Sequence, residues 1–296
     1  MAKKDKTEKD KKTRNKPETP KEPQYYRSGT GEQTINYRVY YMSKIEKIAY
    51  FLLAFAVGAA VGLLFYGGIG KDEYGTATTV TYILDSLIVL VCGVAAGKLF
   101  VPIRTKQILE SRQKKLRTQF RDMLEALTTA LNAGSNVHDA FLSVEEDLKN
   151  QYEEDAFILR ELHVINTGLA NGFVLEEILA DFGRRSGSGD IQNFADVFQI
   201  CYRQGGNIKT TIQNSTEIIS DKMSIEEEIE TTVSGSKNEQ YILLVMPVIL
   251  IGMIKLSSGD FANNFTTLTG VISTTIGVAM FVASYFLGRK LLDIRV

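Results

Sequence analysis

The chain of 296 residues has few of the side chains that metal binding and nucleophilic catalysis use. It contains two cysteines, Cys92 and Cys201, two histidines, His138 and His163, and no tryptophan. The cysteines form no CxxC pair, and the histidines fall on separate predicted helices without the spacing of metal ligands. Cys92 lies in an apolar segment and Cys201 in a charged region, so we expect no disulfide and no metal site.

The chain also lacks the motifs that bind nucleotides or assemble an active site. The pair Gly70-Lys71 looks like the end of a phosphate-binding loop, but Phe65 stands where the first glycine belongs and Asp72 replaces Ser or Thr. No GxSxG occurs. The glutamates between residues 226 and 230 point in different directions around a helix, which favours a solvated face over a cation site. We therefore expect no catalytic residues, no cofactor and no enzymatic activity.

Four apolar segments dominate the rest of the sequence, and they come in two pairs. They cover residues 48–68, 82–103, 241–257 and 268–288. Each is close to the length that crosses about 30 Å of hydrocarbon at about 1.5 Å per residue. Lys98 and Lys255 lie near segment ends, where a long side chain can reach the headgroups. The pattern predicts an all-α polytopic membrane protein with four transmembrane helices.

The distribution of lysine and arginine predicts the orientation. Basic residues crowd the N-terminal tail, residues 104–117 and the C-terminus, whereas the connections at 71–81 and 257–267 contain only Lys71. Because basic loops stay on the cytoplasmic side, both termini and the central region should be cytoplasmic. The expected localisation is the cell membrane, with several passes.

Glycines in the first two segments are spaced for helix packing. Gly58 and Gly62 form one GxxxG pattern, and Gly93 and Gly97 form another. Glycines at this spacing let two helix backbones approach closely, so the two segments are expected to form a packed hairpin. Chance occurrence in apolar sequence is the alternative. Asp85 is expected near the outer interface rather than in a functional site.

The N-terminal region is charged and poor in apolar residues. Residues 1–34 are expected to be disordered, because they cannot bury enough surface to offset their chain entropy. They act either as a solubilising tail or as a basic contact to anionic lipids. Residues 35–47 have an amphipathic pattern that predicts a helix lying on the inner membrane surface.

Residues 104–240 have the apolar periodicity of helices, with Phe120, Leu124, Leu127 and Leu131 as one example. The chain has five prolines, and none of them lies between Pro102 and Pro247, so glycines must end these helices. The segments LNAGSNVHDAF, LANGFVLEEIL and RQGGNIKTTIQ share one layout of helix, glycine and helix. We expect three αα-hairpins that form a six-helix bundle. Their turns are expected to be made by Gly134, Gly172, Gly205 and Gly206. At Gly205 and Gly206 we expect a backbone conformation that side chains oppose, so that a side chain at Gly206 is costly, with direct contact to a partner as the alternative.

The segments FRDMLEALTTALNAGSNVHDAF, GLANGFVLEEILADFGRRSG, CYRQGGNIKTTIQNSTEII and EQYILLVMPVIL carry a family resemblance. Together they resemble the type II secretion system F domain, over about residues 116–290. One such domain with two spans on either side is similar to the TadB/TadC platform subunits of tight-adherence (Flp, type IV) pili. The charged tail is not part of that pattern.

The resemblance implies an inner-membrane platform subunit that couples a cytoplasmic secretion ATPase of the TadA type to extraction and assembly of pilin. Expected partners are that ATPase, prepilin or pilin, the lipid bilayer, and a second platform subunit or another copy of the chain, with no nucleic acid. A platform without nucleotide chemistry must respond through a docking surface. The candidates are charged residues at the hairpin ends: Arg184, Arg185, Arg203 and Lys209, with Asp139, Glu145 and Glu146 on another hairpin.

Two other function classes remain open from the sequence. A membrane transporter or channel component requires charged or broken helices at mid-membrane, and only Asp85 and Pro247 are features of that kind. A membrane enzyme or sensor requires a catalytic or nucleotide-binding motif, and the sequence contains none of those considered above.

Overall fold

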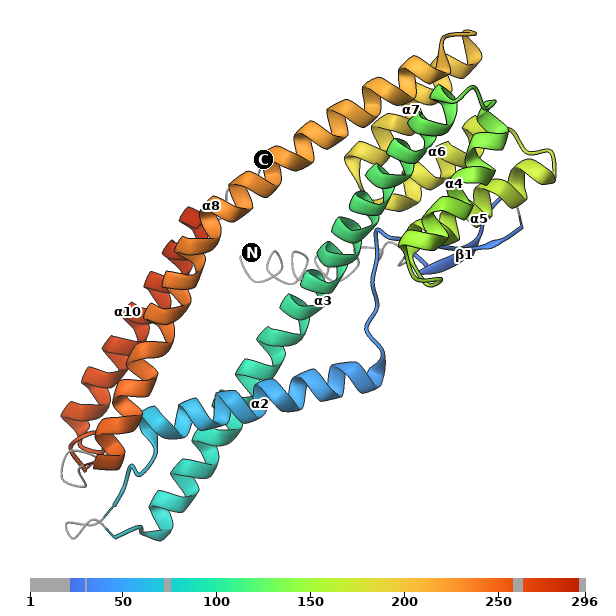
Figure 1. Ribbon diagram of the computed structural model, residues 1–296. Coiled ribbons are helices and arrows are strands. Elements are labelled where there is room, and N and C mark those ends of the chain that lie inside the picture. The colour runs from blue at the N-terminus through green and yellow to red at the C-terminus, as the bar shows by residue number, and fades with distance from the viewer. Residues whose placement is uncertain (1–21, 30, 72–75, 258–262, 293–296) are drawn as a thin grey trace, which may run out of the picture. The chain divides into compact units, whose positions relative to one another are not determined.

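The computed structural model describes residues 22–29, 31–71, 76–257 and 263–292, and helices make up most of them (Figure 1). Two short strands come first, β1 (Tyr25–Arg27) and β2 (Gln33–Ile35). Eight helices follow within the described residues: α2 (Lys44–Tyr66), α3 (Thr79–Asn132), α4 (Val137–Gln151), α5 (Phe157–Ala170), α6 (Leu175–Ser186), α7 (Gly189–Arg203), α8 (Ile208–Ser257) and α10 (Leu268–Leu292).

Four of these helices are long and apolar enough to cross a membrane: α2, α3, α8 and residues 268–288 of α10. This confirms the four helices predicted from the apolar segments, and by length and composition it indicates a multi-pass membrane protein. Helices α3 and α8 have 54 and 50 residues. A span needs about 20 residues, so each continues without a break far beyond its apolar segment.

The chain divides into two compact units. The first contains residues 22–40, 112–123 and 130–208, and we call it the helical body. The second contains residues 41–111, 124–129 and 209–292, and we call it the long-helix unit. The helical body therefore includes β1, β2 and helices α4 to α7 with part of α3. The long-helix unit includes all four apolar segments.

Aromatic side chains fill the core of the helical body. Phe120 is fully buried, and its ring meets the rings of Phe182 and Phe194 edge-on at centroid distances of 5.9 and 5.4 Å. Phe141 and Phe198 are also fully buried. Edge-to-face contacts of this kind add to the free energy gained by burying apolar area. These residues lie on the faces that the periodicity predicts.

Three helices end in the same glycine motif. Gly134, Gly172 and Gly205 have φ angles of 95°, 82° and 69°, in the left-handed region that side chains oppose. The next residue in each case donates its N–H to a carbonyl five residues back: Ser135 to Ala130, Phe173 to Gly168 and Gly206 to Cys201. This is the Schellman arrangement that closes a helix C-terminus.

The fourth predicted turn residue has a different role. Gly206 is not among the glycines with positive φ, so the backbone penalty that we expected at Gly206 belongs to Gly205. An added Cβ at Gly206 would instead lie 2.8 Å from Cys201 Sγ. Gly206 is therefore constrained by a close approach to the preceding helix. Gly187, which was not among the predicted turn glycines, makes another left-handed helix end at the C-terminus of α6.

The N-terminal predictions are wrong where the structure describes them. Strands β1 and β2 pair antiparallel, with Tyr25 opposite Ile35, so residues 25–27 and 33–35 form ordered strands instead of the expected disordered chain. Residues 36–43 contain no helix, and α2 begins only at Lys44, which removes most of the predicted surface helix. Residues 1–21 and 30, to which the disorder prediction also applied, lie outside the described residues.

Within the long-helix unit, α2 and α3 meet through their glycines. An added Cβ would lie 2.5 Å from Ala96 Cβ at Gly58 and 2.9 Å from Cys92 Sγ at Gly62. An added Cβ would also lie 2.5 Å from the ring of Phe55 at Gly93 and 2.5 Å from the ring of Phe51 at Gly97. Both GxxxG patterns therefore lie where the two helix backbones approach closely.

Candidate functional site

The helical body contains a buried cluster of charges centred on Arg185. Its guanidinium donates from Nη1 and Nη2 to the two carboxylate oxygens of Glu161, at 2.9 and 2.7 Å, and from Nε to Asp181 Oδ2 at 2.7 Å. The side chains of Arg185 and Glu161 are each only 2% exposed. A charge in the protein interior is tolerated only when it is paired and hydrogen-bonded, and this bidentate geometry satisfies both groups.

The N-terminal segment is part of the same cluster. The Tyr37 hydroxyl donates to Glu161 Oε1 at 3.0 Å, and Arg185 Nη1 also donates to the carbonyl of Ile35 at 3.1 Å. The backbone N–H of Tyr37 donates to the carbonyl of Arg185, and Gln113 Nε2 donates to the carbonyl of Tyr37, both at 2.9 Å. We call residues 22–40 the strap. These bonds fasten the strap to α5, α6 and residues 112–123 of α3.

The cluster raises the pKa of both Tyr37 and Arg185, which keeps the tyrosine neutral and the arginine charged. Burial raises the pKa of Tyr37 well above its usual value, and the negative charge of Glu161 raises it further. Burial by itself would lower the pKa of Arg185, but attraction and hydrogen bonds from Glu161 and Asp181 outweigh it, and the pKa is raised. Arg185 therefore stays charged and Tyr37 neutral, which is the state that the hydrogen bonds require.

Arg185 consequently cannot belong to an exposed docking surface, and our prediction for this residue is wrong. Its neighbour Arg184 is different: its side chain is 64% exposed, and it contacts Asp181 at 3.4 Å. Residues one apart on a helix point about 100° away from each other, so one arginine faces the core and the other faces solvent. Of the predicted basic docking residues, Arg184, Arg203 and Lys209 are exposed.

On the acidic hairpin, Glu145 is also more constrained than predicted. Its side chain is 12% exposed, pairs with Lys149 at 2.8 Å and accepts from Asn166 Nδ2 at 2.6 Å. Burial raises the pKa of Glu145, but the hydrogen bonds from Lys149 and Asn166 lower it more, so the net shift is downward. Asp139 donates its backbone N–H to the side chain of Asn136, which caps α4. Glu146 remains exposed.

Among the residues that the structure describes, no group of three or more His, Cys, Asp or Glu side chains is placed to hold a metal ion. His163 lies 4.0 Å from Glu145 and is 66% exposed. Asp85, expected near the outer interface, accepts from the backbone N–H of Gly68 at 2.9 Å, close to the end of α2. Cys92 and Cys201 form no disulfide bond.

Glu161 and Tyr37 were not among the residues predicted from the sequence. One signal for Arg185 was present: it stands three residues after Phe182 and seven after Ile178, both buried, so it shares their helix face. An arginine on an apolar face predicts a buried partner. The identity of that partner depends on how α5 packs, which one helix's pattern does not contain.

Comparison of the chain with protein-family models, with curated proteins and with solved structures gave no match.

Proposed function

We propose that the chain is a platform subunit of a type IV (Tad/Flp) pilus or type II secretion machine in the cytoplasmic membrane. In this proposal it couples a TadA-type secretion ATPase to the extraction and assembly of pilin. A second platform subunit, or another copy of the chain, completes the assembly. The proposal rests on the resemblance of residues 116–290 to the F domain, with its three glycine-ended hairpins.

The observation that carries the coupling role is the continuity of α3 and α8. Each is one unbroken helix that begins or ends as an apolar segment and also contributes to the region of residues 104–240. A continuous helix transmits a displacement along its axis better than a flexible linker of the same length. In the proposed topology, residues 104–240 form a cytoplasmic six-helix domain, and both termini are cytoplasmic.

The docking surface of the proposal is reduced to Arg184, Arg203 and Lys209. Charges at an exposed rim mainly control encounter rate and partner choice, and salt screens them. Charge reversal at these positions should therefore impair assembly without affecting folding or insertion. Arg27, which is exposed on β1, offers a matched reversal away from the hairpin ends.

The test has two arms, both on the full-length chain in membranes. Crosslinking followed by affinity purification should recover a secretion ATPase and a prepilin. The triple reversal Arg184→Glu, Arg203→Glu and Lys209→Glu should lower ATPase recovery several-fold, whereas Arg27→Glu should not. Recovery of neither partner would reject the platform role. Solute flux through vesicles containing the purified chain would support a transporter or channel component instead.

A further inference from the structure

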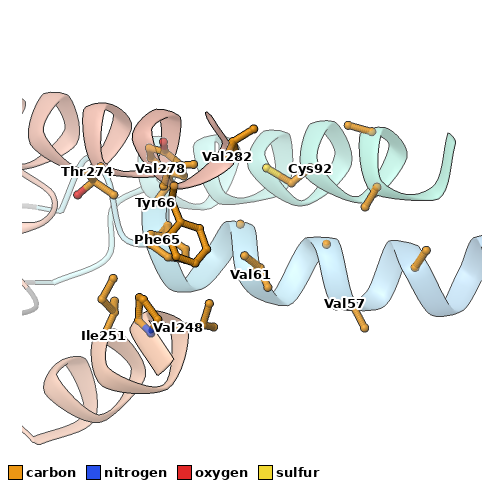
Figure 2. Close-up of a pocket in the computed structure, with 18 of the residues that line it drawn as sticks. Val57, Val61, Phe65, Tyr66, Cys92, Val248, Ile251, Thr274, Val278 and Val282 are labelled. Carbon is orange, nitrogen blue, oxygen red and sulfur yellow. The ribbon is translucent and has the colours of Figure 1, made fainter. Parts of the chain in front are cut away.

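The long-helix unit contains an apolar groove of about 900 Å³. Helices α2, α3, α8 and α10 all contribute to its walls (Figure 2). Phe65 and Val248 lie near one end of the groove, and Val57 lies toward the other (Figure 2). The groove runs beside α2 from Leu53 to Tyr66, which is about 20 Å at 1.5 Å per residue.

Water is not a suitable occupant for this groove. A buried water needs two to four polar partners, and the walls consist mainly of Val, Leu, Ile, Phe, Ala and Gly side chains. All four contributing helices are apolar enough to cross a membrane. The medium around the groove is therefore lipid, and acyl chains are the apolar groups available at that depth.

A transmembrane helix from another protein is the alternative occupant. Helices dock through stripes of small residues, and Gly58 and Gly62 line the groove although they also pack against α3. The charges near the groove favour a lipid with an anionic headgroup over such a helix.

Positive charge lies beside the groove in two places: Lys255 Nζ is 5.0 Å from the ring of Phe265, which lines the groove, and Arg104 is near Phe100 on α3. Phe100 lines the groove, its ring lies 6.3 Å from that of Tyr50, and the Arg104 guanidinium lies 5.5 Å from the Tyr50 ring. Arg104 is one turn beyond Phe100 on α3, and Lys47 is one turn before Tyr50 on α2. Among the described residues, neither Lys47 nor Arg104 forms an ion pair with a carboxylate. Basic and aromatic side chains at this level are typical of headgroup contacts.

We infer that the groove is a binding site for one anionic phospholipid, whose acyl chain lies between the two helix pairs and whose phosphate contacts Lys47 and Arg104. The inference requires only that the four apolar helices lie in a membrane, and it does not depend on the platform role. Its function would be to hold the two helix pairs at a fixed separation, since the lipid fills space that side chains leave empty.

The test uses the full chain, delipidated in detergent, with dioleoyl phosphatidylglycerol or dioleoyl phosphatidylcholine added back and retained lipid counted by native mass spectrometry. The unmodified protein should retain one phosphatidylglycerol in preference to phosphatidylcholine. The double variant Lys47→Gln and Arg104→Gln should lower phosphatidylglycerol retention about 25-fold, because each basic residue near an anionic lipid contributes roughly fivefold. Retention of phosphatidylcholine should not change.

A second variant fills the groove. Gly277 lines the groove and an added Cβ there meets nothing within 4 Å, so we expect the ring of Gly277→Phe to occupy the groove. It should abolish retention of both lipids, whereas Leu90→Phe should not, because Leu90 is 59% exposed and lies outside the groove. Equal loss in both variants, or no loss in Gly277→Phe, would overturn the inference.

A third readout needs no change in the groove. Cys92 lines it, so in a Cys201→Ser background added phosphatidylglycerol should slow the reaction of Cys92 with a maleimide several-fold. An unchanged rate would count against the lipid. Efficient oxidative crosslinking of Cys92 between two copies would assign the groove to a second copy of the chain, and would equally overturn the proposal.

Discussion

The helical body and the long-helix unit place large and small apolar residues in opposite positions. In the helical body the fully buried side chains are large ones such as Phe120, Phe141, Phe182 and Phe198. In α2 the buried residues are Ala54, Ala59 and Gly62, whereas large side chains such as Leu52 and Leu53 are exposed by more than half. Within the apolar windows of α8 and α10, no residue is buried inside the structure.

The solvent around each region explains this reversal. In water, large apolar side chains gain the most free energy from burial, so they collect in the core. In lipid that driving force disappears, and helices associate where small residues let their backbones approach. The helical body can also bury charges: Arg185 lies beside Glu161 there, because hydrogen bonds satisfy both side chains.

The largest expected effect tests the buried charges of the helical body. Arg185→Ala should destabilise it by about 3–5 kcal/mol, because Glu161 keeps a buried charge without its partner. Arg184→Ala is the matched control on the same helix, and it should cost about 1 kcal/mol or less, because its ion pair is exposed. Pulse proteolysis of the full chain in detergent, across a urea series, measures both. Similar losses in the two variants would show that Arg185 does not carry the cluster.

Close helix packing in the long-helix unit gives the next effect. Gly58→Ala should cost about 1–3 kcal/mol, since the new methyl group meets Ala96 Cβ and the Cys92 carbonyl. Gly277→Ala has open space and should be neutral, or stabilising by about 0.5–1 kcal/mol through helix propensity. The measurement is the temperature at which Cys92 becomes reactive, in a Cys201→Ser background. An unchanged temperature in Gly58→Ala would remove the glycine contact as the basis of the α2–α3 hairpin.

Backbone conformation in the helical body gives a smaller effect. Gly205→Ala should cost about 1–2 kcal/mol, because its φ of 69° is in the left-handed region. Gly189→Ala, with open space and no positive φ, is the control and should be near neutral. Urea unfolding followed by circular dichroism separates the two. If both variants unfold together, helix ends do not limit the stability of this body.

The sequence predicts the membrane-spanning helices and the glycine turns well, because the signal for each is contained in a short stretch of chain. A run of about 20 apolar residues marks a span, and a glycine followed by a new apolar period marks a turn, as at Gly134, Gly172 and Gly205. The strap was missed for the opposite reason. Strands of three residues such as Tyr25–Arg27 are too short to show a period of two, and the strap is held by contacts distant in sequence.

The candidate docking surface was predicted less well, because charge alone does not reveal burial. Arg184 and Arg185 are adjacent and of the same type, yet one is exposed and the other is buried. The difference follows only from their positions around the helix axis relative to the buried Phe182. Glu161 lies 24 residues from Arg185 in the chain, so only the packing of α5 against α6 identifies it as the partner. The acyl-chain groove is similar, since it is formed by four segments whose sequences each predict only a span.

The smallest effect concerns the strap and its one buried hydroxyl. Tyr37→Phe removes the hydrogen bond to Glu161 Oε1 but leaves that oxygen bonded to Arg185. The expected cost near neutral pH is about 0.5–1.5 kcal/mol. Tyr25→Phe, at a residue that is 52% exposed, is the matched loss of a hydroxyl on the same segment and should cost almost nothing. Equal stability of the two variants would mean that the strap is held by its backbone contacts alone.

Comparison of the unmodified protein with Tyr37→Phe also gives a prediction for alkaline pH. Burial, with the charge of Glu161, raises the pKa of folded Tyr37 well above 10, whereas the unfolded tyrosine loses its proton near pH 10. Below that pH both states keep the proton, and the contribution of the hydroxyl to stability is constant. Above it only the unfolded state ionises, so stability falls by up to about 1.4 kcal/mol per pH unit. Tyr37→Phe has no proton to lose, and its disadvantage should shrink and then reverse as the pH rises past 10. Parallel stability curves for the two proteins between pH 8 and 11 would contradict the buried position of this hydroxyl.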